Sequence, residues 1–215
     1  MAALTASGGQ TVTDCYCLWC GRSLRRESSF LHLIQVDDVL CQMCRHEMSF
    51  RPRNIKVDDL RVHSLYVYEG LTREMVIQYK ELYDEALFPV FLYPHVERLQ
   101  RRYRGHTLVP VPSSEENNRK RGFRAVDMMF SILDLPMADM LGKKDNHDQK
   151  NTDFRRRHEI REHLFLKENE RVGRKVLLVD DIVTTGETLK ACRDILTEAG
   201  HEVCILTLCY NKRFL

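Results

Sequence analysis

The residues best suited to chemistry lie together at 176–188, where an apolar run passes through two acids into a threonine-rich turn and an amphipathic segment. The run is typical of a strand that is buried on both faces of a sheet. At a turn into a helix, backbone N–H groups and the positive helix end attract an anion, and threonine hydroxyls donate to phosphate oxygens. Gly186 allows close backbone approach. The stretch predicts a phosphate site with Asp180 and Asp181 beside it, at the carboxyl end of a strand.

This stretch resembles the phosphoribosyl-pyrophosphate (PRPP) loop of type I phosphoribosyltransferases, which has four apolar residues, two acids, two apolar residues and Thr-Thr-Gly-x-Thr. The resemblance implies that the turn holds the 5′-phosphate and that Asp180 and Asp181 contact the ribose hydroxyls. It also implies Mg²⁺, bound mainly by oxygens of PRPP itself. An ordinary strand-to-helix turn with a capping threonine is the plain alternative, but it explains one hydroxyl only. The residues expected to bind PRPP here are Ile182, Val183, Thr184, Thr185, Gly186, Glu187 and Thr188.

Chain length and net charge limit the possible domain organisation and binding partners. The chain has 215 residues and a net charge of +2, enough for one α/β domain with a small appendage. With so little net charge, any nucleic-acid surface has to come from local clusters. No apolar run approaches the roughly 20 residues of a membrane helix, and residues 1–14 lack the features of a signal peptide. We therefore expect a cytoplasmic protein without membrane insertion.

Five of the eight cysteines lie in the first 44 residues, four of them in two Cys-x-x-Cys pairs. The pairs are separated by about 20 residues, as in zinc ribbons. Four thiolates close a tetrahedron around Zn²⁺ without an open position, so the metal is expected to be structural. Cys15 could replace Cys17 as a ligand, and His32 and His46 are weaker alternative ligands. The plain alternative to a metal site is a set of unrelated free thiols. The expected ligands are Cys17, Cys20, Cys41 and Cys44.

Periodicity and turn residues predict the elements around these motifs. A break at 51–54 suggests a division into an N-terminal tail with a zinc-ribbon module, 1–52, and a phosphoribosyltransferase-like domain, 53–215. The alternation of strands and helices from residue 107 onward predicts a parallel α/β sheet flanked by helices. Strands are expected at 62–68, 108–112, 163–166 (an edge strand), 176–179 and 202–208, and helices at 71–87, 125–133 and 187–199. A further helical stretch, interrupted by Pro89 and Pro94, runs toward Arg104.

Three clusters of cations could face an anion. One cluster extends from Arg98 to Arg104, and the favoured interpretation of it is a solvated helix face. Another is the run 119–124. The third lies in the polar segment 142–161, which is long for a compact domain and predicts either a mobile loop that closes over a substrate or a basic linker. The candidates for nucleic-acid contact are Arg119, Lys120, Arg121, Arg124, Arg155, Arg156 and Arg157.

The order of the motifs is similar to the ComF/ComFC family of competence-associated phosphoribosyltransferase-like proteins. The matching features are the cysteine ribbon, Tyr79-Lys80, Val-Pro-Val-Pro at 109–112, Arg-Gly-Phe at 121–123, a segment from Gln149 to Arg157, and the PRPP loop. The resemblance implies a type I phosphoribosyltransferase-like fold with a small zinc module, a role in DNA uptake, and a ComFA-type ATPase as partner.

The same resemblance implies roles for single residues. Residues 109–114, with Pro112 and Ser113, would form the pyrophosphate loop, and Gln149 and Arg157 would belong to the mobile loop. Two departures concern the site of the acceptor base rather than the phosphate. Arg124 and Ala125 stand where the family has Asn-Gln, and Ile160 stands where it has Asn.

Two functions follow from these observations. In the first, a PRPP-binding protein acts in DNA uptake and contacts single-stranded DNA. In the second, an active phosphoribosyltransferase displaces pyrophosphate from PRPP, and cations stabilise the leaving group. No side chain is an evident general base for an acceptor. The candidate catalytic residues are Asp180, Asp181, Lys80 and Arg121.

Overall fold

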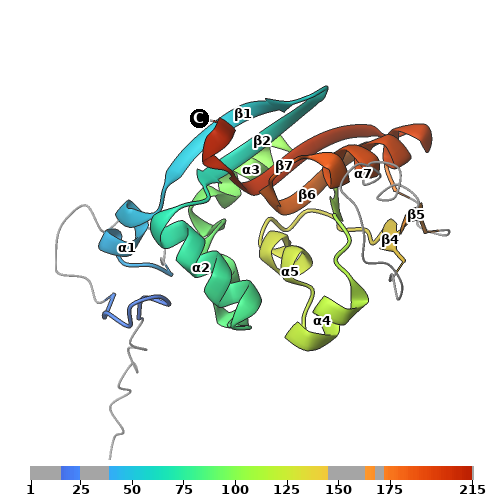
Figure 1. Ribbon diagram of the computed structural model, residues 1–215. Helices are drawn as coiled ribbons and strands as arrows, with labels where there is room; N and C mark the ends of the chain where they lie inside the picture. The colour runs from blue at the N-terminus through green and yellow to red at the C-terminus, as the bar shows by residue number, and fades with distance from the viewer. Residues whose placement is uncertain (1–15, 25–38, 145–162, 168–171, 215) are drawn as a thin grey trace, which may run out of the picture.

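A mostly parallel sheet forms the centre of the protein (Figure 1). The structure, a computed structural model, describes residues 16–24, 39–144, 163–167 and 172–214. The strand order is β1-β2-β7-β6-β3, in which β1 runs antiparallel to β2 and the other neighbours are parallel. The predicted α/β class is confirmed, with one antiparallel edge strand added. The five strands are β1 (Phe50–Val57), β2 (Leu60–Val67), β3 (Thr107–Pro110), β6 (Lys175–Val183) and β7 (Glu202–Tyr210).

Helices cover both faces of this sheet. Successive residues of β6 point to opposite sides, so Leu177 and Val179 join one buried cluster while Val176 and Leu178 join the other. The first cluster packs against α2 (Gly70–Glu81), α3 (Val96–Arg102), α5 (Ala125–Ser131) and the 3-10 turn η2 (Glu85–Val90). The second packs against α7 (Glu187–Glu198) and a two-stranded sheet of β4 (Leu141–Lys143) and β5 (Leu164–Leu166).

Several elements differ from the sequence expectations. Strand 163–166 exists as β5 but pairs with β4 rather than with the central sheet. The helix expected over 71–87 ends at Glu81, because Tyr83 adopts a positive φ of 61° and Pro89 lies in the following 3-10 turn. The helical stretch before residue 104 is a short turn, η3 (Tyr93–His95), followed by α3. Among the described residues, no helix is long and apolar enough to cross a bilayer.

Strand β1 lies where the sequence suggested a boundary. Residues 51–54 belong to this edge strand, and its register shifts between Phe50 and Arg53, around Pro52. Edge strands and bulges tolerate proline because its nitrogen has no ladder bond to donate there. Only Ile55 and Val57 of β1 are buried, so the strand lacks a strong apolar signal. The division at 52/53 falls inside β1 and stays a prediction.

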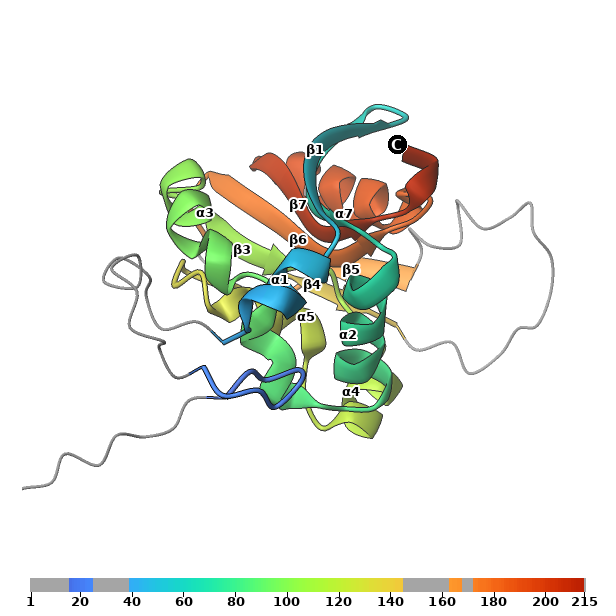
Figure 2. The same ribbon diagram turned by 90° about the vertical axis from the view of Figure 1, so that its left-hand side faces the viewer.

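The cysteine-rich segment packs directly on the sheet domain. Leu40 and Met48, on either side of α1 (Gln42–Glu47), are buried in the same cluster as Met75 of α2. The N–H of Ser49 donates to Oγ1 of Thr72 at 3.0 Å, and the Ser49 carbonyl accepts from Val67 at 2.9 Å. Figure 2 shows α1 beside α2. The two parts therefore share one core.

Candidate functional site

The turn between β6 and α7 has the predicted strand–turn–helix form. Gly186 caps α7 with a positive φ of 79°, and a Cβ at this position would lie 2.7 Å from Cγ1 of Val57. Both the φ value and the lack of space require glycine. Thr184 and Thr185 are exposed, and the guanidinium of Arg213 donates to the Thr184 carbonyl. The backbone of the turn is therefore held between the β1–β2 hairpin and the C-terminal segment.

The expected pyrophosphate loop lies next to this turn. Strand β3 pairs in parallel with β6, and the N–H of Val111 donates to the Val179 carbonyl at 2.9 Å. Buried Pro112 and half-buried Ser113 follow directly. Ser114 then caps α4 (Glu115–Arg121) by accepting from the Asn117 N–H at 3.3 Å. The two predicted phosphate loops thus leave the sheet from neighbouring carboxyl ends, where ligands bind in open α/β sheets.

The two acids meet Lys80 at this edge. Lys80, in the last turn of α2, forms an ion pair with Asp181, and the two side chains are 20% and 10% exposed. Oδ1 of Asp180 accepts the backbone N–H of Asp181 at 2.8 Å. The fold thus brings three predicted site residues together, from two elements that are distant in sequence.

Burial destabilises the charged forms of both Asp180 and Lys80. It raises the pKa of Asp180 to about 7, and the Lys80 charge opposes this effect. It also lowers the pKa of Lys80, which the Asp180 charge counteracts. A nearby opposite charge or a hydrogen bond to the ionised form would favour the charged carboxylate. The acids are therefore suited to a ligand that brings hydroxyl donors or a divalent cation.

Arg121, the last residue of α4, packs against the end of α2. Its Nε donates to the Lys80 carbonyl at 2.9 Å, its Nη2 lies 3.6 Å from Oε1 of Glu81, and its side chain is 9% exposed. A cation at a helix C-terminus is favourable. The charge of Arg121 also lowers the pKa of Lys80. Arg121 therefore contacts the backbone that carries Lys80, and these two contacts are to α2 rather than to the two acids.

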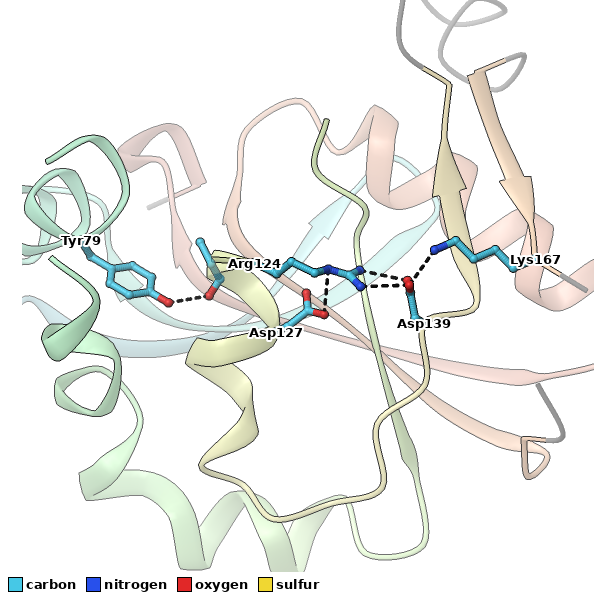
Figure 3. Close-up of polar contacts among 6 residues, drawn as sticks. Tyr79, Arg124, Asp127, Asp139 and Lys167 are labelled. Atoms are coloured by element: carbon cyan, nitrogen blue, oxygen red, sulfur yellow. Dashed lines mark hydrogen bonds and ion pairs between the residues drawn. The ribbon is translucent and has the colours of Figure 1, made fainter. Parts of the chain in front are cut away.

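Arg124 belongs to an ion-pair network that sequence reasoning missed (Figure 3). Its guanidinium donates two bonds of 2.9 Å to Asp139 and lies 3.1 Å from Asp127. Lys167 joins the same Asp139 carboxylate at 2.6 Å. The hydrogen bonds that Arg124 donates to Asp139 lower the pKa of Asp139 and raise the pKa of Arg124. The network ties the start of α5 to the β4–β5 sheet.

The other basic candidates divide into two groups. Arg119 and Lys120 are exposed on α4, where Lys120 pairs with Glu116 at 2.6 Å. A nucleic-acid role for them, and for Arg121 and Arg124, stays a prediction. Arg155, Arg156, Arg157 and Gln149 lie outside the described residues, as do Cys15 and His32.

The four predicted cysteine ligands meet in one cluster. Their sulfur atoms all lie within 4.8 Å of one another, and Cys20 and Cys41 are 3.7 Å apart. A tetrahedron with Zn–S bonds of 2.3 Å has edges of roughly 3.8 Å. Cys17, Cys41 and Cys44 are buried while Cys20 is exposed, and His46 lies outside the cluster. The donor set fits a closed structural site for a metal such as Zn²⁺.

These observations define the class of protein. Residues 119–213 match the family model described as phosphoribosyl transferase domain. Together with the mostly parallel sheet and the turn after β6, this match shows a type I phosphoribosyltransferase-like fold.

Over most of its length the chain is similar to Competence protein ComFC. Identity is 24% to the protein of Streptococcus pneumoniae (strain ATCC BAA-255 / R6), over 86% of this chain and 94% of that protein. It is 25% to the protein of Bacillus subtilis (strain 168), over 91% of this chain and 93% of that protein. The resemblance stated from the motifs is confirmed.

Solved structures give more distant similarities. Adenine phosphoribosyltransferase from Leishmania tarentolae covers 77% of this chain and 96% of its own, at 14% identity and a TM-score of 0.39. A hypoxanthine phosphoribosyltransferase from Staphylococcus aureus covers 60% of this chain and 66% of its own, at 14% identity and a TM-score of 0.35.

Proposed function

We propose that this protein binds PRPP with Mg²⁺ and acts in DNA uptake during natural transformation, in contact with single-stranded DNA. The observation that carries the PRPP site is the group of Lys80, Asp180 and Asp181, next to a glycine-capped threonine turn at the carboxyl edge of the sheet. The similarity to Competence protein ComFC supports the process. A cytoplasmic location and a ComFA-type ATPase partner belong to the same proposal.

Each group at the edge has a task in this proposal. The backbone and hydroxyls of residues 182–188 hold the 5′-phosphate. Asp180 and Asp181 accept bonds from the ribose hydroxyls, and the oxygens of bound PRPP supply most of the Mg²⁺ ligands. Lys80 leaves Asp181 and turns to the pyrophosphate beside the loop with Pro112 and Ser113. Arg121 holds the Lys80 backbone during this change.

An active phosphoribosyltransferase is the second candidate. Lys80 and the nearly buried Arg121 bring two positive charges to the end of α2, and preorganised cations stabilise a departing pyrophosphate best in a dry site. Within the described part of the chain, the ionisable groups at the carboxyl edge are already assigned to phosphate, ribose or ion pairs. The acceptor and its base therefore have no candidate among them.

One preparation of the metal-loaded chain separates the two functions. Binding of a labelled single-stranded oligonucleotide is measured at low salt, and pyrophosphate release from PRPP is measured with a panel of bases and ammonia. We expect DNA binding and no release above the background hydrolysis of PRPP. Pyrophosphate release that depends on the base offered, together with no DNA binding, would contradict the proposal and support an active phosphoribosyltransferase.

A further inference from the structure

The β1–β2 hairpin presents two cations directly opposite each other. Lys56 of β1 pairs in register with Arg61 of β2, and both side chains are exposed. Like charges at such positions destabilise a sheet. Within the described ranges, neither residue has a carboxylate as an ion-pair partner. The protein therefore keeps an unfavourable pair where a polar neutral residue would fit.

This pair faces away from the phosphate turn. Val57 packs near Gly186 on the side of α7. Because neighbouring residues of a strand point to opposite sides, Lys56 points away from α7, and Arg61 does so with it. His63, two residues after Arg61, lies on the same side and shares a hydrogen bond of 2.9 Å between its Nδ1 and the Tyr103 hydroxyl. The outer side of the hairpin therefore continues toward α3, which lies behind β2 in Figure 1.

Helix α3 adds two more cations on this side. Arg98 and Arg102 are four residues apart, so they share one face of the helix, and both are exposed. Burial, followed by the charges of Arg102 and Arg98, lowers the pKa of His63 to about 4. No carboxylate in the described part of the chain forms an ion pair with either arginine, whereas their neighbour Arg101 lies 3.6 Å from Glu97.

An aromatic side chain ends the row of cations. The Phe50 ring is 38% exposed and stacks on His95 at 4.2 Å with an angle of 11° between the rings. The guanidinium carbon of Arg98 lies 5.6 Å from the centre of the same ring. Lys56 lies six positions after Phe50 on β1, about 20 Å away at the usual rise of a strand. That length suits several nucleotides.

We propose that the hairpin–α3 surface, formed by Lys56, Arg61, Arg98, Arg102 and Phe50, binds single-stranded nucleic acid. The cations contact successive backbone phosphates and the Phe50 ring contacts a base, the combination that single-strand binding requires. An acidic protein would satisfy the cations but would not need the exposed ring. The inference rests on the proposed contact with DNA but moves it away from the segments 119–124 and 155–157. It also separates DNA from PRPP, since the surface faces away from the phosphate turn.

The test measures binding of a labelled single-stranded oligonucleotide to the full metal-loaded chain over a range of salt concentrations. The variants are K56Q/R61Q and R98Q/R102Q, and the matched control R73Q/K175Q removes two exposed cations elsewhere. Each test pair should flatten the slope of log affinity against log salt by about 1.4, since each single-strand phosphate contact adds roughly 0.7. The control should leave the slope unchanged. Phe50→Leu should weaken binding about fivefold or more without changing the slope.

Each outcome of this test either supports or overturns the proposed surface. Equal behaviour of test pairs and control, with wild-type binding intact, overturns this placement and leaves the proposed function standing. Absence of wild-type binding at low salt overturns both. Displacement of the DNA by polyglutamate at equal charge concentration would make the surface a site for acidic protein and would also overturn the inference. Saturating PRPP with Mg²⁺ should not displace the DNA, and PRPP binding by the variants should equal that of wild type. If a double variant fails to fold, Arg61→Gln alone should flatten the slope by about 0.7.

Discussion

Lys80 at the end of α2 forms an ion pair with Asp181 at the end of β6, across 101 residues of sequence. The pair lies at the carboxyl edge of the sheet. Asp181 is satisfied by Lys80 and Asp180 by a backbone N–H. A sugar phosphate that needs both acids has to replace Lys80 at Asp181, and its pyrophosphate offers the released ammonium a new partner. In the proposed function, the ion pair is therefore both a stabilising contact and a part of the PRPP site.

Replacement of Lys80 should separate these two roles. Lys80→Met should weaken PRPP binding by roughly tenfold or more because a charge-assisted contact is lost. It should also lower the melting temperature, since the buried Asp181 loses its partner. Lys175→Met, at an exposed cation, serves as control and should change neither. The double variant K80M/D181N should recover part of the stability lost in K80M. Additive losses in the double variant would contradict the pairing.

The raised pKa of Asp180 predicts how stability depends on pH. Its carboxyl pKa is about 7 in the fold against an ordinary value of 3.8, so the folded state binds the proton more tightly. The stabilising contribution is full below about pH 4 and is lost as the pH rises through about 7. Denaturant unfolding of wild type and Asp180→Asn between these values should show a fall in wild type that the variant lacks. Parallel curves for the two proteins would refute the shift.

Gly186 allows conformational strain to be distinguished from a steric clash. Gly105 has almost the same φ, 78° against 79°, but a Cβ there would meet open space. Both alanine variants should lose about 1 kcal/mol from the positive φ. Gly186→Ala should lose more, because its Cβ would press on Val57, and it alone should lose PRPP affinity. Thermal unfolding and calorimetric titration provide the two measurements. Equal losses with unchanged PRPP binding would show that the tight turn has no part in the site.

The cysteine cluster should couple metal to the fold of the whole chain. Purified protein should carry about one zinc, and Cys44→Ser should remove most of it. Because Cys44 is buried in the same cluster as Met75 of α2, the loss should lower the melting temperature of the entire domain. Metal analysis and Trp19 fluorescence follow the change. Cys204→Ser, at an exposed cysteine outside the cluster, is the control. Full stability and an unchanged Trp19 signal in chelator would contradict a structural site.

The local motifs were readable from sequence because their chemistry is contiguous. The turn at 184–186 and the paired cysteines each carry their signal within a few residues. The network of Arg124, Asp139 and Lys167 has no such signal, since its members lie in three separate segments of the chain that only the fold brings together.

The sequence did not predict strand β1, or the place of the basic face of α3 beside the hairpin, for a related reason. Most of β1 faces solvent, and Pro52 argues against a strand unless the edge position is known. Arg98 and Arg102 read as a solvated helix face until the hairpin with Lys56 and Arg61 is placed beside them.

Calorimetric titration with PRPP and Mg²⁺ tests the central claim most directly. The metal-loaded wild-type chain should bind about one PRPP, and D180N/D181N should bind at least roughly tenfold more weakly while remaining folded, because amides are poorer acceptors of ribose hydroxyls. Asp58→Asn, at an exposed acid in the hairpin turn, should bind as wild type does. No heat of binding from the folded wild-type protein, or equal affinity in D180N/D181N, would contradict a PRPP site at this edge.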